Sequence, residues 1–157
     1  MESTIKHIHS ALIAQNKTVS LAESCTGGML SSLLTAQSGA SAYFVLGVIV
    51  YSNQMKNKLL GIPLSVIERR GAVSKEVATA MAAAVRKVAK TDFGIGITGI
   101  AGPLGGSKDK PVGTVYIAEA SNRVKICRRF NFKGSRTSIR KQSCLAALMM
   151  LKKLLDN

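Results

Sequence analysis

The sequence predicts an α/β domain in which a mixed sheet of about five strands lies between two layers of helices. Three observations predict it. Helix-like and strand-like segments alternate through most of the chain, two strand-like segments near the C-terminus can form a hairpin, and a long helix-like segment follows them. At 157 residues the chain is long enough for one domain with a sizeable core, so we expect residues 1–157 to form a single domain.

The first third of the chain predicts two helices and one strand. Four apolar residues at helical spacing indicate an N-terminal amphipathic helix: Ile5, Ile8, Leu12 and Ile13. Residues 18–22 alternate as a short buried strand. Thr26 and two glycines then open a helix that extends to about Gln37, and the loop 38–42 leads to the next strand.

The middle of the chain predicts one strand and three helices. Residues 43–52 are rich in β-branched and aromatic side chains, which favour a strand. The first helix after it is predicted over 54–60, with Ser52 or Asn53 as cap and Gly61 as its end. Pro63 starts a further helical turn or two, which Gly71 stops, and a long helix is predicted over 74–90, where good helix formers dominate.

The last third predicts the remaining strands and a final helix. The strands are expected over 93–98, 112–120 and 124–132, and the last two form a hairpin. The glycine-rich segment 99–111 is the longest loop. The final helix begins at Ser135 or Thr137, and its predicted apolar face includes Ile139, Leu145, Leu148, Met149 and Leu154.

The cysteines and the apolar runs exclude several classes of protein. No apolar run reaches the roughly 18 residues that a membrane helix needs, and an acid at position 2 argues against a secretory signal. Cys25, Cys127 and Cys144 are odd in number, widely spaced and form no CxxC pair. We therefore expect a cytoplasmic protein with reduced thiols, no membrane span, no disulfide framework and no zinc site.

The net charge of +14 is the most unusual global feature. Between Ser107 and Lys141 the chain has ten Lys or Arg residues and only two acids. Such a surplus favours polyanion binding, but the sequence has no aromatic-rich strand pair of the RNA-recognition type, no zinc-finger spacing and no basic helix with heptads. We expect a solvated basic surface and not a specific nucleic-acid site.

Three segments follow predicted strands and carry reactive or flexible residues: AESCTGG over 22–28, YSNQMK over 51–56 and TGIAGPLGG over 98–106. In open α/β sheets, ligands gather where strands end and helices begin, because loops converge there and helix N-termini present unpaired N–H groups. The sequence therefore predicts a site at this edge of the sheet.

Ser24 is a candidate nucleophile in the first of these segments. A hydroxyl at a sharp strand-to-helix turn can be presented to substrate, with N–H groups beyond it to stabilise an oxyanion, and Gly27 and Gly28 allow close approach. The alternative is an ordinary helix cap formed by Ser24 or Thr26. Cys25 is a rival nucleophile, but a thiolate needs a base such as histidine, so we expect Cys25 to be buried.

Lys56 is the candidate base, since the only histidines, His7 and His9, lie on different faces of the first helix. Burial and the surrounding positive charge would both lower its pKa into a useful range. The alternative is a solvated helix lysine. The glycine-rich third segment is either a phosphate cradle or a plain flexible loop; it matches neither GxxxxGK[ST] nor GxGxxG after the strand.

Together, five segments resemble the CinA C-terminal domain family: AESCTGG, GVIVYSNQMKNKLLGI, GAVSKEVA, GITGIAGPLGG and KPVGTVYIA. The resemblance runs from about Ile5 to Leu154. This family includes stand-alone amidohydrolases of nicotinamide mononucleotide (NMN). The resemblance implies a Ser/Lys hydrolase that converts NMN and water to nicotinic acid mononucleotide and ammonia, with Ser24 as nucleophile, Lys56 as base and Tyr51 assisting.

The resemblance also implies a substrate pocket. We expect no cofactor, and no metal because the sequence has no clustered set of His, Cys and carboxylate ligands. The substrate-binding residues that the resemblance implies are Thr26, Gly27, Gly28, Thr98, Gly99 and Gly102, with Arg136 and Arg140 as candidates for the phosphate. We expect a small-molecule nucleotide as substrate, the single-domain form of the family, and a homo-oligomer. The alternative is a module of the same family that binds a nucleotide or a competence or repair partner without turnover.

The chain departs from the family pattern at two positions. Family members often carry Arg before the glycine of the second strand and His before GAVS, where this chain has Leu46 and Arg70. The proposed chemistry depends on Ser24 and Lys56, which are both present.

Overall fold

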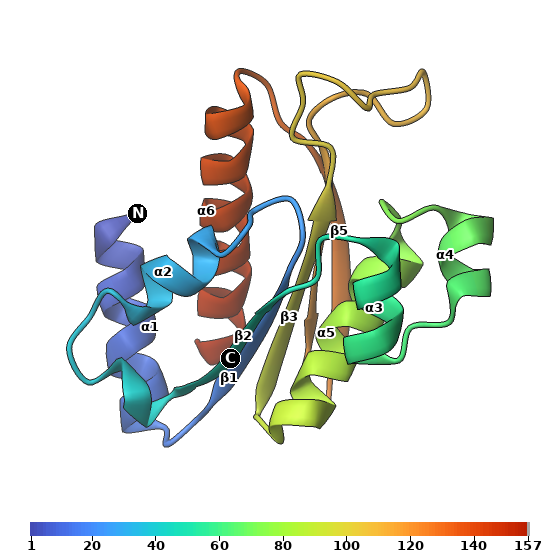
Figure 1. Cartoon of the computed structure of the whole chain (residues 1–157). Helices are drawn as coiled ribbons and strands as arrows, with labels where there is room; N and C mark the ends of the chain where they lie inside the picture. The colour runs from blue at the N-terminus through green and yellow to red at the C-terminus, as the bar shows by residue number, and fades with distance from the viewer. Residues whose placement is uncertain (157) are drawn as a thin grey trace.

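The computed structural model describes residues 1–156 and shows a sheet between two helical layers (Figure 1). One layer is formed by α1 (Glu2–Ala14), α2 (Met29–Thr35) and α6 (Arg136–Leu155), and the other by α3 (Asn53–Leu60), α4 (Leu64–Arg70) and α5 (Lys75–Ala89). The predicted three-layer α/β/α class is confirmed. Asn157, the last residue of the predicted domain, lies outside the described residues.

The sheet is mixed, as predicted, with strand order β2-β1-β3-β4-β5. Its strands are β1 (Val19–Glu23), β2 (Phe44–Ile49), β3 (Phe93–Gly99), β4 (Thr114–Ala120) and β5 (Lys125–Asn131). Strand β1 pairs in parallel with β2 and β3, while β4 is antiparallel to both β3 and β5. The C-terminal ends of β1, β2 and β3 therefore meet at one edge, which is where the three segments singled out in the sequence begin.

Helix starts are set by serine caps and by glycine. Ser52 and Ser135 each accept a hydrogen bond from the N–H group three residues on, which settles the two open choices of cap. Helix α2 is shorter than the predicted 26–37. Gly27 and Gly28 have φ of +59° and +87°, so the chain makes a left-handed turn before the helix begins.

The predicted apolar face of α6 is wrong in part. Leu145 and Met149 are 36% and 52% exposed, and Leu154 is only half-buried. The buried residues of α6 are Ile139, Ser143, Cys144, Ala147, Leu148, Met150, Leu151 and Leu155. The prediction favoured large apolar side chains, whereas a helix that packs on both α1 and β4 also buries small residues. The Ser143 hydroxyl is satisfied by donating to the Ile139 carbonyl, 2.8 Å away.

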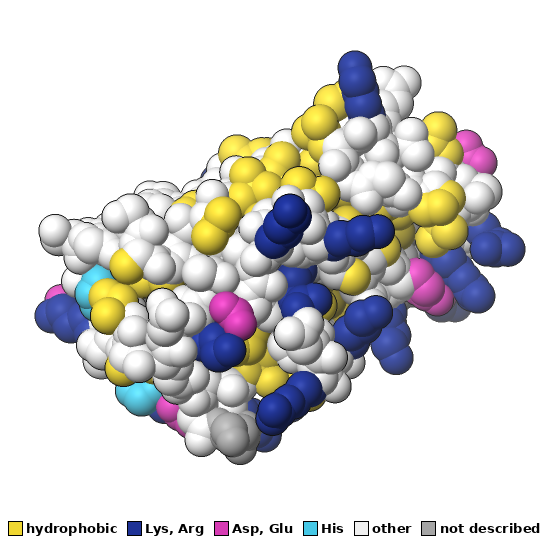
Figure 2. All heavy atoms as spheres, turned by 90° about the horizontal axis from the view of Figure 1, so that it is seen from below, with side chains coloured by type: hydrophobic (Ala, Val, Ile, Leu, Met, Phe, Trp, Pro, Cys, Tyr) yellow, Lys and Arg dark blue, Asp and Glu magenta, His cyan; other side chains and the backbone are white. Residues whose placement is uncertain are grey.

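The surface carries the positive charge. The face seen in Figure 2 shows many Lys and Arg side chains and few Asp or Glu. Among residues 1–156, Lys56 is the one Lys or Arg whose side chain is buried. The same described part of the chain has no helix both long and apolar enough to cross a membrane.

Two glycines of β3 allow α5 to lie directly on the sheet. A methyl group at Gly96 would lie 2.6 Å from the Ala82 nitrogen and would overlap the Ala78 carbonyl, both on α5. Gly94 is similarly close to Ala82 and Arg86. The helix can approach this closely only because these two positions lack side chains.

We therefore expect Gly96→Ala to lower the free energy of unfolding by about 2–4 kcal/mol, because the added methyl group forces α5 away from the sheet. Gly61→Ala is the matched control. Gly61 has φ of +66° and open space around it, so alanine there pays only the conformational cost of about 1–2 kcal/mol. Urea unfolding of both variants measures the difference. Equal losses would contradict the packing argument.

Candidate active site

A cavity of about 280 Å³ lies at the edge where β1 and β3 end. Its wall is formed by the turn after β1, the start of α3, the segment before α5, the glycine-rich loop after β3 and the first residue of α6. Seven residues predicted from the sequence line it: Ser24, Tyr51, Lys56, Thr98, Gly99, Gly102 and Arg136. The structure thus brings the three segments together around one space.

Ser24 and Lys56 are in contact inside this cavity. Lys56 Nζ lies 3.2 Å from Ser24 Oγ, 2.9 Å from the Val50 carbonyl and 3.1 Å from the Tyr51 carbonyl. Carbonyl oxygens only accept, so they hold two of the amine's hydrogens. In the neutral amine the remaining direction, toward Ser24, carries the lone pair. A neutral Lys56 is therefore oriented to take the Ser24 proton.

Burial favours this neutral form. The Lys56 side chain is 1% exposed, and burial lowers the pKa of its amine below the ordinary value. Surrounding positive charge, which the sequence suggested as a second cause, is not among the causes; the Cys25 thiol opposes the shift weakly. The solvated-lysine alternative is excluded by the geometry.

Cys25 is buried, as expected, and poorly suited to act as a nucleophile. Its side chain is 6% exposed and burial raises the pKa of its thiol to about 12, so a thiolate is scarce near neutral pH. The histidines of α1 are occupied elsewhere. His7 Nε2 lies 2.7 Å from Asp156, and His9 Nδ1 lies 3.4 Å from the Tyr43 hydroxyl. Neither histidine lines the cavity.

Tyr51 and Arg136 form the mouth of the cavity. The Arg136 guanidinium donates to the Tyr51 hydroxyl at 3.0 Å and to the Gly102 carbonyl at 2.8 Å. Both side chains are exposed, so the guanidinium faces solvent where a ligand would enter. Thr98 is a buried residue of the cavity wall. Its hydroxyl donates to the Ala72 carbonyl at 2.8 Å, which ties β3 to the segment before α5.

Four other residues implied by the resemblance do not line the cavity: Thr26, Gly27, Gly28 and Arg140. The Arg140 guanidinium instead donates twice to the Thr26 carbonyl, at 2.6 and 3.2 Å. This contact braces the turn that carries Ser24 against α6. Of the two arginines considered for phosphate binding, the structure leaves Arg136 at the mouth and uses Arg140 as a structural brace.

Glu23 is a site residue that the sequence analysis missed. Its fully buried carboxylate accepts hydrogen bonds from the N–H groups of Gly28, Leu30 and Ser31, at 3.0, 3.2 and 2.7 Å, and from the Ser31 hydroxyl at 2.6 Å. Glu23 lies on β1, and its carboxylate thus accepts hydrogen bonds from N–H groups at the start of α2 that have no partner within the helix. The sequence does contain a signal for this role, which is an acid directly before the candidate nucleophile and shortly ahead of a helix.

The remaining sequence features lie outside the cavity wall. Leu46 packs against the core cluster beneath α5, and Arg70 pairs with Glu76 at 3.4 Å. Among residues 1–156, no group of three or more His, Cys, Asp and Glu side chains is placed to hold a metal ion.

The fold is that of a known family. The family model described as the CinA C-terminal domain matches residues 1–155, and the chain belongs to that family. A CinA-like protein of Leptospira biflexa is 47% identical over 152 residues, which are 96% of this chain and 36% of the relative. A CinA-like protein of Syntrophus aciditrophicus is 44% identical over 156 residues, covering 98% and 37%. The chain thus spans about a third of the length of these relatives.

Solved structures of this superfamily share the fold over nearly their whole length. The competence/damage inducible protein CihA of Agrobacterium tumefaciens superposes with a TM-score of 0.95 at 34% identity, covering 99% of this chain and 95% of that one. The competence damage-inducible protein A of Klebsiella pneumoniae gives a TM-score of 0.95 at 29% identity, covering 99% and 97%.

We expect Glu23→Gln to lower the free energy of unfolding by about 2–3 kcal/mol. The amide retains one acceptor oxygen but turns an NH₂ group toward N–H donors, which leaves buried donors unpaired. Glu68→Gln, at an exposed position on α4, is the control and should change stability by less than about 0.5 kcal/mol. Chemical denaturation of both variants tests this, and a Glu23→Gln protein as stable as the control would remove Glu23 from this role.

Proposed function

We propose that the protein is an amidohydrolase that converts NMN and water to nicotinic acid mononucleotide and ammonia. One observation carries the proposal: a buried lysine amine, held by two carbonyls, lies 3.2 Å from a serine hydroxyl inside a cavity. Serine is a weak nucleophile unless a neighbouring base takes its proton, and a desolvated lysine can serve as that base.

The reaction runs in two halves. Neutral Lys56 takes the Ser24 proton while Oγ attacks the carboxamide carbon, which forms a tetrahedral oxyanion. The carbon–nitrogen bond then breaks, the Lys56 ammonium returns a proton to the leaving nitrogen, and ammonia departs from an ester on Ser24. Water, deprotonated by Lys56, attacks this ester and releases the carboxylic acid with Ser24 and Lys56 restored.

The surrounding residues suit this chemistry. The N–H group that follows the nucleophile, that of Cys25, belongs to a residue of the cavity wall and is the candidate for stabilising the oxyanion. Arg136 at the mouth supplies a guanidinium for the phosphate of the nucleotide, while the nicotinamide and ribose enter the cavity. In this proposal Tyr51 assists twice: its carbonyl holds Lys56 and its hydroxyl holds Arg136.

A second candidate is a nucleotide-binding module without turnover. The names of the solved relatives, which refer to competence and damage induction, favour it, as does the fact that the matched relatives are much longer than this chain. Ammonia release distinguishes the two, because a binding module would take up NMN and leave it intact.

We expect purified protein to release ammonia from NMN, with nicotinamide and nicotinamide riboside as poorer substrates because they lack the phosphate. Ser24→Ala should lower kcat by at least about a thousandfold while the fold is retained. Cys25→Ala, at the adjacent position, should keep most of the activity. Activity that disappears with a chelator, or that needs Cys25 and not Ser24, would overturn the proposed mechanism.

We also expect kcat/KM to rise with pH through an ionisation below the ordinary lysine pKa of about 10.4, since Lys56 must be neutral to act and burial lowers its pKa. Lys56→Arg keeps the charge and cannot lose its proton, so it should be as inactive as Lys56→Met. Lys58→Arg, on the exposed side of α3, should be fully active. Circular dichroism confirms folding, and an active Lys56→Arg enzyme would exclude Lys56 as the base.

A further inference from the structure

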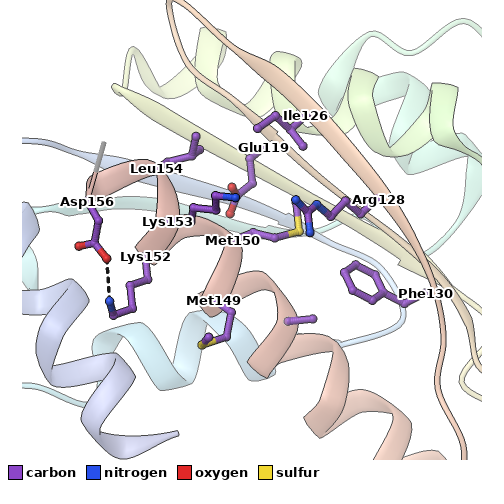
Figure 3. Close-up of a pocket in the computed structure, with 11 residues that line it drawn as sticks. Glu119, Ile126, Arg128, Phe130, Met149, Met150, Lys152, Lys153, Leu154 and Asp156 are labelled. Carbon is purple, nitrogen blue, oxygen red and sulfur yellow. Dashed lines mark hydrogen bonds and ion pairs between the residues drawn. The ribbon is translucent and has the colours of Figure 1, made fainter.

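A second and larger cavity, of about 480 Å³, lies between the C-terminal half of α6 and strands β4 and β5 (Figure 3). It shares no lining residue with the candidate active site. The helix itself separates the two. Arg136 lies at its first residue and Lys152 sixteen residues later, about 24 Å along the axis at 1.5 Å per residue.

The base of this cavity contains a buried carboxyl group without a partner. Glu119 on β4 is 2% exposed, and neither of its carboxylate oxygens has a hydrogen-bond partner among the described residues. In Figure 3 its side chain points from the sheet into the space in front of α6. Leaving such a group unpaired costs free energy, which a ligand that completes its hydrogen bonds would recover.

Burial raises the pKa of the Glu119 carboxyl to about 8, and the guanidinium of Arg128 opposes this only in part. A carboxyl with this pKa is mostly protonated near pH 7. A protonated carboxyl presents one donor and one acceptor side by side. Its complement is a flat edge with an acceptor next to an N–H donor.

The rest of the wall is apolar on the inside and cationic at its rim. Apolar contacts come from both sides of the cavity: Ile126 and Phe130 on β5, and Ala146, Met149, Met150 and Leu154 on α6. Arg128, Lys152 and Lys153 add positive charge. The one acid besides Glu119, Asp156, already accepts from Lys152 at 2.6 Å and contacts His7 at 2.7 Å.

We propose that this cavity binds an adenine nucleotide, with the adenine edge paired to Glu119, the ring against Phe130 and the methionines, and the phosphate beside Arg128 at the cationic rim. Adenine offers the required acceptor beside an N–H donor, and the volume is within the usual range of about 300–1,000 Å³ for small-molecule sites. The proposal is independent of NMN deamidation, because it concerns different residues.

A second copy of the chain is a poorer occupant. Strand β5 is the edge of the sheet and carries Lys125, Arg128 and Arg129, so two such edges would bring like charges together. A fatty acid would fill the apolar wall but would leave Glu119 unpaired. A ligand with a polar heteroaromatic end and an anionic end satisfies both requirements.

Titration calorimetry of the whole protein with AMP, adenosine and purine riboside 5′-monophosphate tests the proposal. We expect AMP to bind at one site per chain, and purine riboside 5′-monophosphate at least tenfold more weakly, because it has a hydrogen in place of the amino group of adenine and so lacks the N–H donor beside the ring acceptor. Glu119→Gln keeps a donor beside an acceptor and should bind AMP within about threefold of wild type. Glu119→Leu, which suits an apolar interior, should remain folded and lose at least tenfold.

Arginine variants separate this site from the active site. Arg128→Gln should weaken AMP at least fivefold and adenosine little, since only AMP has the phosphate. Arg129→Gln is the matched control, because the Arg129 side chain lies on the other face of β5, over Tyr116, and AMP affinity should not change. Arg136→Ala should also leave AMP affinity unchanged.

The proposal is overturned if AMP fails to saturate, if Arg136→Ala abolishes AMP binding, or if Glu119→Leu binds as wild type does. It is also overturned if purine riboside 5′-monophosphate binds as tightly as AMP, or if sedimentation shows that self-association covers the cavity. A protein that binds AMP here and leaves NMN intact would refute the proposed function alone.

Discussion

The contact between a buried lysine amine and a serine hydroxyl is the constraint on which the arrangement of the site depends. Lys56 reaches Ser24 because the carbonyls of Val50 and Tyr51 lie beside the end of β1. The parallel pairing of β1 and β2 continues one step past the strands, where the Val50 N–H donates to the Glu23 carbonyl at 2.9 Å. The pairing of β1 with β2 therefore positions both Ser24 and the two carbonyls that orient the Lys56 amine.

The turn after β1 is held from both sides. The Glu23 side chain accepts from the start of α2, and Arg140 on α6 donates to the Thr26 carbonyl. These are charge-assisted hydrogen bonds in a buried setting, which are stronger than those between neutral groups. The turn can thus keep two consecutive left-handed glycines and still present Ser24 in one position. Helix α6 contributes to this brace at its N-terminal end and to a separate cavity at its C-terminal end.

Most of the fold follows from local patterns, because periodicity and turn residues predicted the layers and the mixed sheet. Ser24 and Lys56 became candidates because both follow strands, but an ordinary cap and a solvated lysine remained open as alternatives. The roles of nucleophile and base came from the resemblance to the family. Glu23, the brace by Arg140 and the orphan carboxyl of Glu119 were not predicted. Arg140 contacts a residue 114 positions away, and the isolation of Glu119 depends on what packs around it. The sequence shows neither of these directly. The error at Leu145 and Met149 has the same origin, because helix neighbours decide which face is buried.

The proposed mechanism requires that Lys56 is neutral under working conditions, and burial favours that form. Side-chain NMR of protein labelled with ¹³C at the lysine ε-carbons measures this directly, with the Lys56 signal assigned from its absence in Lys56→Met. We expect this one signal to titrate below the ordinary lysine value of about 10.4, and the shift to survive in Ser24→Ala, where the amine is still buried. A Lys56 signal that titrates at or above 10.4 would mean that the amine is charged beside Ser24 and cannot act as its base.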